Sequence, residues 1–257
     1  MESVVLEQEP ARADRSADPA ARQNGDSVLA IMRSHDLLGV LSERDLVALA
    51  RQCPVKTLPK NRVLFRTGDQ GHSVVLVLQG YIKLSTMAAN GREVVLEIAA
   101  PGSIFGEIAV LTDSSRRADA TTLTTSRVMA IDGAHFRRAL AASSEAMFAA
   151  IRLLSERLSA VTMREMDSVA LPASVRLAKA LLRLAQQHSG RLEDGAQIGF
   201  RLSQRELGAM TGLIRESINK HLKAWRAAGW VELSGGSVTL RDVRALQEFV
   251  HDSEPRH

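Results

Sequence analysis

A short run of charged side chains near the C-terminal end carries the chemistry that base reading requires. Arg215 can donate two parallel hydrogen bonds to guanine O6 and N7, and the adjacent Glu216 can accept one from cytosine N4. Lys220 follows Glu216 by about one helical turn, so it can reach a further base or a phosphate. Charged residues also solvate the outside of many helices. The three residues therefore indicate nucleic-acid recognition only if the elements around them present them to a duplex.

The segments that flank these residues predict a helix-turn-helix followed by a wing. Ser203 begins the capping box Ser-Gln-Arg-Glu, which predicts a helix start, and Gly212 supplies the turn. A second helix is predicted over 214–225. Its inward face is expected to hold Ile214, Ile218, Leu222 and Trp225. Residues 229–240 predict a two-stranded hairpin, and Asp242 can cap a closing helix. This order of elements favours a recognition helix in the major groove over a merely solvated surface.

A second motif, Phe-Gly-Glu-Ile-Ala, occupies residues 105–109 and precedes an arginine pair. From Gly106 onward the chain can form a short helix whose first N–H groups face an anion. Glu107 could accept a hydrogen bond from a ribose hydroxyl, and Arg116 can fork onto a phosphate. Surface arginines and partly buried glutamates are common, so this pattern alone does not identify a ligand.

The elements that carry this second motif are predicted to be short strands. Residues 55–131 alternate β-prone runs with glycine-containing turns and include no long helix, which favours an antiparallel roll or barrel. One long run covers 74–87 and contains Gly80, and Asn90-Gly91 predicts a type I′ hairpin turn. A short helix capped by Ser42 is expected before these strands, with Cys53 packed at its end.

A long helix is predicted between the two motifs, over about 140–167, where the chain has no glycine or proline. Ile151, Leu154, Leu158 and Val161 follow one another at heptad spacing. Such a short stripe can pack on its own domain or against a second chain, and the spacing does not decide between them. Pro172 prevents the helix from continuing, so a hinge is expected at 168–171.

Composition and charge limit the class of protein. The 257 residues are enough for two domains, and 45% hydrophobic with 24% charged residues is ordinary for a globular chain. The net charge of +4 comes from the last third: residues 1–169 hold 20 basic and 20 acidic side chains, and residues 170–257 hold 13 and 9. This is a mild nucleic-acid signal. No apolar run reaches the roughly 20 residues that cross a bilayer.

Several chemistries are not expected. The single cysteine cannot form an intramolecular disulfide, and it cannot by itself ligate zinc or an iron–sulfur cluster, so a reducing cytoplasm is the expected compartment. The seven histidines form no His-Glu-x-x-His motif, and no Gly-x-Ser-x-Gly or Walker motif occurs, so we expect no catalytic site and no metal. Residues 1–26 lack the apolar core of a secretory signal and are expected to be a poorly ordered tail.

The segment 212–220, Gly-Leu-Ile-Arg-Glu-Ser-Ile-Asn-Lys, resembles the recognition helix of Crp–Fnr transcription regulators. The resemblance implies that Arg215, Glu216 and Lys220 read the bases of a TGTGA-type half-site. The family usually has Ser or Thr before the arginine for a phosphate contact, whereas this chain has Ile214. The candidate DNA-binding residues are Ser203, Arg205, Arg215, Glu216, Ser217, Asn219, Lys220 and Lys223.

The motif at 105–109 with Arg116 resembles the phosphate-binding cassette of cyclic-nucleotide-binding domains, and the resemblance extends over about 38–250. It implies cyclic AMP or cyclic GMP as the ligand. The chain departs from the family at Arg117, where Ser, Thr or Ala is usual, and at Val161-Thr162, where the cyclic-AMP receptor protein has Thr-Ser against the adenine. The candidate nucleotide-binding residues are Gly106, Glu107, Ile108, Ala109, Arg116, Arg117, Val161 and Thr162.

Together these patterns predict an α+β protein that is not an enzyme. We expect a tail over 1–26, a β-roll sensor domain over 27–139, a dimerisation helix over 140–168 and a winged helix-turn-helix domain over 169–257. The resemblance implies a homodimer on palindromic double-stranded DNA, with RNA polymerase as a further partner and no membrane. The alternative is a regulator of the same family whose sensor domain binds no nucleotide.

Overall fold

The computed structural model describes residues 19–253, with side chains from Gly25 onward. These residues form two compact units. The first contains the described residues up to Thr86 together with Glu97–Arg157, and the second contains Met87–Leu96 and the chain from Leu158. The expected tail over 1–18 lies outside the described residues. Residues 19–26 of that expected tail are helical, which corrects the prediction for them.

Two four-stranded antiparallel sheets form the predicted β-roll. One sheet has the order β1 (Val55–Leu58), β8 (Ser126–Asp132), β3 (Ser73–Gln79) and β6 (Ile104–Phe105). The other has the order β2 (Val63–Phe65), β7 (Asp119–Thr122), β4 (Ile82–Met87) and β5 (Glu93–Ala99). Val75, Val77 and Phe105 are fully buried in the apolar cluster that both sheets share. The roll is therefore confirmed, and the 105–109 motif begins at Phe105, the last residue of β6.

Glycine decides where the long β-prone run breaks. The run over 74–87 forms two strands and not one. Strand β3 ends at Gln79, directly before Gly80, and β4 begins at Ile82. Gly80 has φ +85°, and a Cβ there would lie 2.4 Å from Ser126 Oγ. The type I′ prediction at Asn90-Gly91 is wrong, since only Gly91 has positive φ (+75°). The Asn90 side chain instead accepts a hydrogen bond from the Arg92 N–H at 3.0 Å, which is an Asx turn.

Four helices pack with the roll in the first unit. They are α1 (Pro19–Ser34), α2 (Glu43–Gln52), α3 (Glu107–Leu111) and α4 (Gly133–Ala141). Ser42 caps α2 as predicted, and its hydroxyl accepts from Asp45 N at 3.1 Å. Val28 and Met32 of α1 share one buried cluster with Leu46 of α2 and with Cys53. This burial explains why the chain is helical well before residue 27.

The long helix α5 spans Ser144–Ala170, which shifts both predicted ends. It starts later than expected because Asp132 caps the separate helix α4, accepting from Ala134 N and His135 N at 3.0 Å. It also ends later, so the expected hinge residues 168–170 are helical. The break falls at Leu171, and Pro172 (φ −54°, ψ 150°) is the N-cap of the next helix, where a proline is tolerated.

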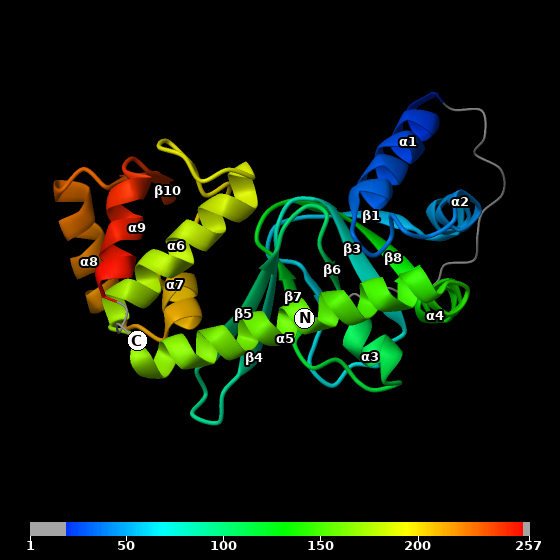
Figure 1. The fold of residues 1–257 in the computed structure, drawn as a ribbon, viewed down its shortest axis with the longest axis horizontal. Coiled ribbons are helices and arrows are strands. Elements are labelled where there is room, and N and C mark those ends of the chain that lie inside the picture. The colour runs from blue at the N-terminus through cyan, green and yellow to red at the C-terminus, as the bar shows by residue number, and fades with distance from the viewer. Residues whose placement is uncertain (1–18, 254–257) are drawn as a thin grey trace. The chain divides into compact units, whose positions relative to one another are not determined.

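The second unit contains a winged helix-turn-helix (Figure 1). This part of the unit consists of α6 (Ala173–Ser189), α7 (Gln204–Thr211), α8 (Arg215–Ala227), β9 (Val231–Ser234), β10 (Ser237–Leu240) and α9 (Val243–Asp252). The wing turns through Gly235 and Gly236, whose φ values of +57° and +84° are those of a two-glycine hairpin turn. Trp225 of α8 meets Trp230 and Phe249, with ring centroids 6.5 and 5.8 Å away. Of the helices that the structure describes, none has the length and hydropathy of a membrane span.

Candidate nucleic-acid interface and sensor site

Local interactions that the sequence predicted fix the start of α7 and the turn between α7 and α8. Ser203 Oγ accepts from Glu206 N at 3.1 Å, and Glu206 Oε2 accepts from Ser203 N at 2.6 Å, so the capping box is complete. Gly212 ends α7 with φ +74°, and its N–H donates to Gly208 O at 2.8 Å. A Cβ at Gly208 would lie 2.8 Å from the Leu213 carbonyl oxygen. The two helices can therefore approach closely only with glycine at that position.

Helix α8 has one buried face and one exposed charged face. Ile218, Leu222 and Trp225 are buried, as predicted. The side chains of Arg215, Glu216, Lys220 and Lys223 are exposed. With this arrangement the apolar face of the helix packs on the rest of the domain, and the charged face can contact bases in a DNA groove.

The predicted inward position of Ile214 is wrong, because its side chain is 60% exposed. Ile214 is the N-cap of α8 and has extended backbone (φ −81°, ψ 156°), so it does not follow the helical periodicity on which the prediction relied. Its side chain makes no cap hydrogen bond. The exposed apolar side chain therefore stands beside Arg215 at the start of the recognition helix.

The other candidate DNA-binding residues lie around the same helix ends. Ser203 and Arg205 are exposed at the start of α7, whereas Ser217 and Asn219 are partly buried on α8. The structure adds Gln204, which the sequence analysis did not select. Gln204 Oε1 accepts from Arg215 Nε at 2.6 Å and from Asn219 Nδ2 at 3.2 Å. No periodic signal identifies this residue, because the contact depends on how α7 crosses α8.

Two substitutions are expected to change stability in opposite directions through the helix caps. Ser203→Ala removes the capping-box acceptor and should lower the free energy of unfolding by about 0.5–2 kcal/mol. Ile214→Ser supplies the acceptor that the α8 N-cap lacks, and it should raise the free energy of unfolding by about 0.5–1 kcal/mol. Urea denaturation followed by circular dichroism measures both. A stabilising Ser203→Ala or a destabilising Ile214→Ser would contradict this account of the caps.

The sensor motif is built around two buried charged residues. Glu107 is 2% exposed at the start of α3, and Arg116 is 4% exposed. Arg116 Nη1 donates to the Gly106 carbonyl at 2.9 Å and Nη2 donates to the Ser73 carbonyl at 2.6 Å. Burial lowers the pKa of Arg116, although nearby carboxylates oppose this change. Gly106 has φ +84°, and a Cβ there would lie 2.3 Å from Arg116 Nη1, so any other residue would strain the backbone and displace the guanidinium.

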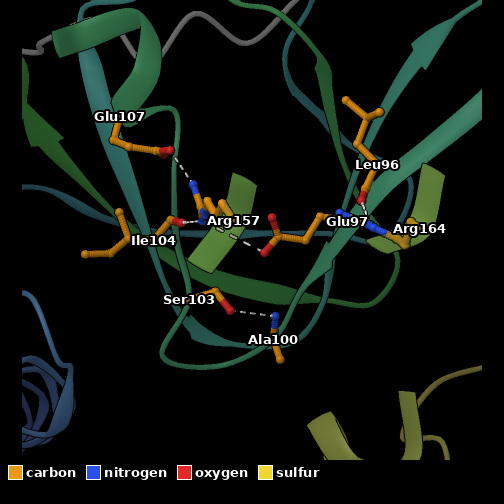
Figure 2. Close-up of polar contacts among 8 residues, drawn as sticks. All are labelled: Leu96, Glu97, Ala100, Ser103, Ile104, Glu107, Arg157 and Arg164. Carbon is orange, nitrogen blue, oxygen red and sulfur yellow. Dashed lines mark hydrogen bonds and ion pairs between the residues drawn. The ribbon is translucent and has the colours of Figure 1, made fainter. Parts of the chain in front are cut away.

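A third charged residue, Arg157 of α5, completes this site. Figure 2 shows its guanidinium between Glu107 and Glu97. Arg157 Nη1 donates to Glu107 Oε1, Nη2 donates to the Ile104 carbonyl, and Nη2 lies 3.9 Å from Glu97 Oε1. Burial disfavours the charge on Arg157, but the two carboxylates together raise its pKa above the ordinary value. The sequence analysis did not select this residue, because an arginine on a helix carries no local signal of partners that are distant in the sequence.

Two buried polar atoms at this site have no hydrogen-bond partner. They are Glu107 Oε2, which is an acceptor, and Arg116 Nε, which carries a donor. A buried polar atom without a partner costs about 1–3 kcal/mol, so such atoms mark places where a ligand can supply the missing bond. The acceptor without a partner fits a ligand hydroxyl, and the donor without a partner fits an anionic oxygen of a ligand.

The remaining candidate nucleotide-binding residues are distributed differently. Ala109 is buried, while Ile108 is 47% exposed. Arg117 is exposed, in contrast to its buried neighbour Arg116. Val161 and Thr162 are exposed on the part of α5 that belongs to the second unit, and Thr162 Oγ1 donates to the Leu158 carbonyl of its own helix at 3.0 Å. Within the first unit, the structure therefore brings Gly106, Glu107 and Arg116 together, whereas Ile108 and Arg117 are exposed. Within residues 19–253, no group of three or more His, Cys, Asp or Glu side chains is arranged to hold a metal ion.

Comparison with known proteins accounts for both motifs. Residues 55–143 match the family model of the cyclic nucleotide-binding domain, and residues 175–249 match that of the Crp-like helix-turn-helix domain. The chain is also 31% identical over 202 residues to a CRP-like cAMP-activated global transcriptional regulator of Mycobacterium tuberculosis. The aligned residues cover 78% of this chain and 90% of the relative. The chain belongs to the Crp–Fnr family of transcription regulators.

Two further comparisons concern a sequence relative and a solved structure. The Cyclic AMP receptor protein of Thermus thermophilus is 29% identical over 199 residues, covering 74% of this regulator and 85% of the relative. The structure of FixK2 from Bradyrhizobium japonicum superimposes with a TM-score of 0.69 at 18% identity, covering 80% of this regulator and 98% of FixK2. The second likeness concerns the fold alone. This Crp–Fnr regulator is therefore a DNA-binding transcription regulator with a cyclic nucleotide-binding domain, and the mycobacterial relative is named as a transcriptional regulator.

Proposed function

We propose that this regulator acts as a homodimer that binds palindromic duplex DNA through α8 and is controlled by cyclic AMP or cyclic GMP. The observation that carries the proposal is the exposed Arg215-Glu216 pair on α8, whose opposite face is buried. In this scheme residues 27–139 sense the ligand, α5 joins the two protomers, and residues 169–257 bind DNA. We further place the protein in the cytoplasm, with RNA polymerase as a partner.

The DNA-binding part of the proposal assigns separate roles to the exposed side chains. Arg215, Glu216 and Lys220 read base edges, because their side chains can match the donors and acceptors of guanine and cytosine. Lys223 lies one turn further and contacts phosphate, as do Ser203 and Arg205 at the start of α7. Phosphate contacts release counterions, so binding weakens as salt increases.

The ligand part of the proposal rests on Glu107 and Arg116. A cyclic nucleotide, when bound, supplies a phosphate anion and a ribose hydroxyl. Glu107 Oε2 would accept from the hydroxyl, and Arg116 would hold the phosphate. Arg157 already donates to the other oxygen of Glu107, which holds that carboxylate in a fixed orientation. The names of the mycobacterial and Thermus relatives favour cyclic AMP, whereas Val161 offers no hydroxyl to a base.

A nucleotide-independent regulator is the second candidate. It is favoured by one observation, which is that both terminal nitrogens of Arg116 already donate to main-chain carbonyls. In that case Arg116 would hold the cassette in shape, and DNA binding would not respond to either nucleotide.

The dimer part of the proposal rests on an exposed apolar row along α5. Phe148, Ile151, Leu158 and Val161 are 67%, 51%, 68% and 51% exposed. Exposed apolar rows of this kind usually mark surfaces that a partner covers. A second copy of α5 packed on the row would relate the two recognition helices by a two-fold axis, and half-sites about 34 Å apart would then be read together.

Placing a charge in this row should dissociate the dimer. We expect Leu158→Asp to raise the dimer dissociation constant by roughly a hundredfold or more, because two apolar contacts are lost and two like charges face each other. Analytical ultracentrifugation measures this constant. The matched control is Ser159→Asp, one position along on the same exposed helix, which should leave the dimer intact. A Leu158→Asp protein that remains dimeric would show that another surface joins the protomers.

Selection of duplexes from a randomised library, repeated with no nucleotide, with cyclic AMP and with cyclic GMP, tests the whole proposal. The expected product is a palindrome with a guanine–cytosine pair in each half-site, and its enrichment should increase with one of the nucleotides. Equal enrichment in all three selections would favour the nucleotide-independent candidate. Failure to enrich any sequence would overturn the assignment of α8 as the reading element.

A further inference from the structure

Gln204 forms the centre of a polar cluster on the reading face that the proposed roles do not include. It is the first residue of α7, and its partly buried amide contacts two side chains of α8. Gln204 Oε1 accepts from Arg215 Nε at 2.6 Å and from Asn219 Nδ2 at 3.2 Å. Gln204 Nε2 donates to Asn219 Oδ1. One amide from the first helix of the motif thus holds two side chains of the second.

The contact with Arg215 restricts how that guanidinium can meet a base. A guanidinium can donate in pairs from Nη1 and Nη2 or from Nε and one terminal nitrogen. Because Nε already donates to Gln204, only the terminal pair stays available for a bidentate contact. Gln204 therefore selects an end-on approach of Arg215 to guanine O6 and N7.

The contact with Asn219 keeps Gln204 itself in place. The two amides exchange reciprocal hydrogen bonds, so the orientation of each fixes the oxygen and nitrogen of the other. Rotation of Gln204 toward a phosphate would break both of these bonds as well as the bond to Arg215. The cluster is therefore preorganised before any DNA arrives, which reduces the side-chain entropy lost on binding.

We propose that Gln204 is a specificity-determining positioning residue, which orients Arg215 for its guanine without contacting the base. This inference rests on the proposed function, because it assumes that Arg215 reads a guanine. It predicts that the loss of the Gln204 acceptor relaxes discrimination at a single base pair. A direct phosphate contact by Gln204 would instead weaken binding to every sequence alike.

The test uses the full-length protein and the duplex obtained by selection, with single base-pair changes in one half-site. Fluorescence anisotropy gives the ratio of dissociation constants for the altered and selected duplexes. Gln204→Met keeps the length of the side chain and removes the acceptor, whereas Gln204→Glu keeps an acceptor oxygen for Arg215 Nε. The matched control is Gln247→Met, a glutamine that is exposed on α9. Melting curves for each variant check that the domain remains folded.

We expect Gln204→Met to reduce discrimination at the guanine of Arg215 by about tenfold, with less than about twofold change at the other positions. Gln204→Glu should restore most of that discrimination, and Gln247→Met should match the wild type. In an Arg215→Ala background, Gln204→Met should have no further effect at this base pair, because the two residues act as one unit.

The inference is overturned if Gln204→Met retains wild-type discrimination, or if it weakens all duplexes equally with and without Arg215. Those results differ from a failure of the proposed function, in which the wild-type protein itself would show no preference at any guanine. Loss of folding in Gln204→Met leaves Gln204→Glu as the decisive variant. If that variant lowers discrimination at the guanine as much as Arg215→Ala does, the positioning role is rejected.

Discussion

Arg215→Ala is expected to weaken binding to the selected half-site by about 1–3 kcal/mol, which is roughly five- to 150-fold in affinity. The loss should fall on one guanine, because the exposed guanidinium of Arg215 is the group that can donate to O6 and N7 together. Once alanine replaces it, the preference at that base pair should relax, while the preferences at the other positions remain. Binding of single-substitution duplexes measures the effect directly.

Lys223→Ala provides the matched control for this prediction. Lys223 is exposed on the same helix, two turns after Arg215. As a phosphate contact, its loss should weaken binding to all duplexes similarly and reduce the salt slope by about one unit. Equal losses on every sequence for Arg215→Ala would remove Arg215 from the base readers.

Arg116→Ala is expected to abolish the stabilisation of this regulator by its cyclic nucleotide. A ligand present at about 100 times its dissociation constant stabilises the folded protein by about 2.7 kcal/mol, so the wild type should melt at a clearly higher temperature with one of the two nucleotides. Arg116 is the buried cation that contacts the Gly106 carbonyl, so its loss removes the group proposed to hold the phosphate. Thermal melting with cyclic AMP, with cyclic GMP and with neither measures the change.

The same substitution should also destabilise the protein without ligand. Arg116 satisfies the carbonyls of Gly106 and Ser73, and the loss of these bonds should cost about 1–3 kcal/mol. The informative quantity is therefore the ligand-induced shift within each variant, rather than the melting temperature itself. Arg62→Ala is the control, since this arginine directly before β2 is exposed, has no proposed role, and should keep both stability and response. If neither nucleotide shifts the wild-type melting point, the ligand-gated form of the proposal is wrong.

The winged helix-turn-helix could be predicted almost element by element, because the sequence signals for its helices and turns are local. The capping box at Ser203, the left-handed Gly212 and the cap at Asp242 each act within a few residues, and each occurs as expected. Ile214 was misplaced because periodicity does not extend to an N-cap. Gln204 could not be predicted, since its contacts with α8 depend on the angle at which two helices cross.

The architecture of the first unit was predicted correctly, and the ends of its helices were predicted less well. Alternating strands and turns indicated the roll, but the gap between α4 and α5 has neither glycine nor proline to mark it. Helix α1 was not predicted, because its stability comes from packing Val28 and Met32 onto a distant part of the chain. Arg157 was missed for a related reason: its partners Glu107 and Glu97 are about fifty residues or more away in the sequence.

The most direct test of the central claim, that α8 reads duplex DNA, is a salt titration of binding to the selected palindrome and to a duplex of scrambled sequence. We predict that the logarithm of the association constant falls linearly with the logarithm of the salt concentration for both duplexes. The selected palindrome should bind about a thousandfold or more tightly at physiological salt. Equal affinity for the two duplexes, or binding that does not respond to salt, would contradict the account.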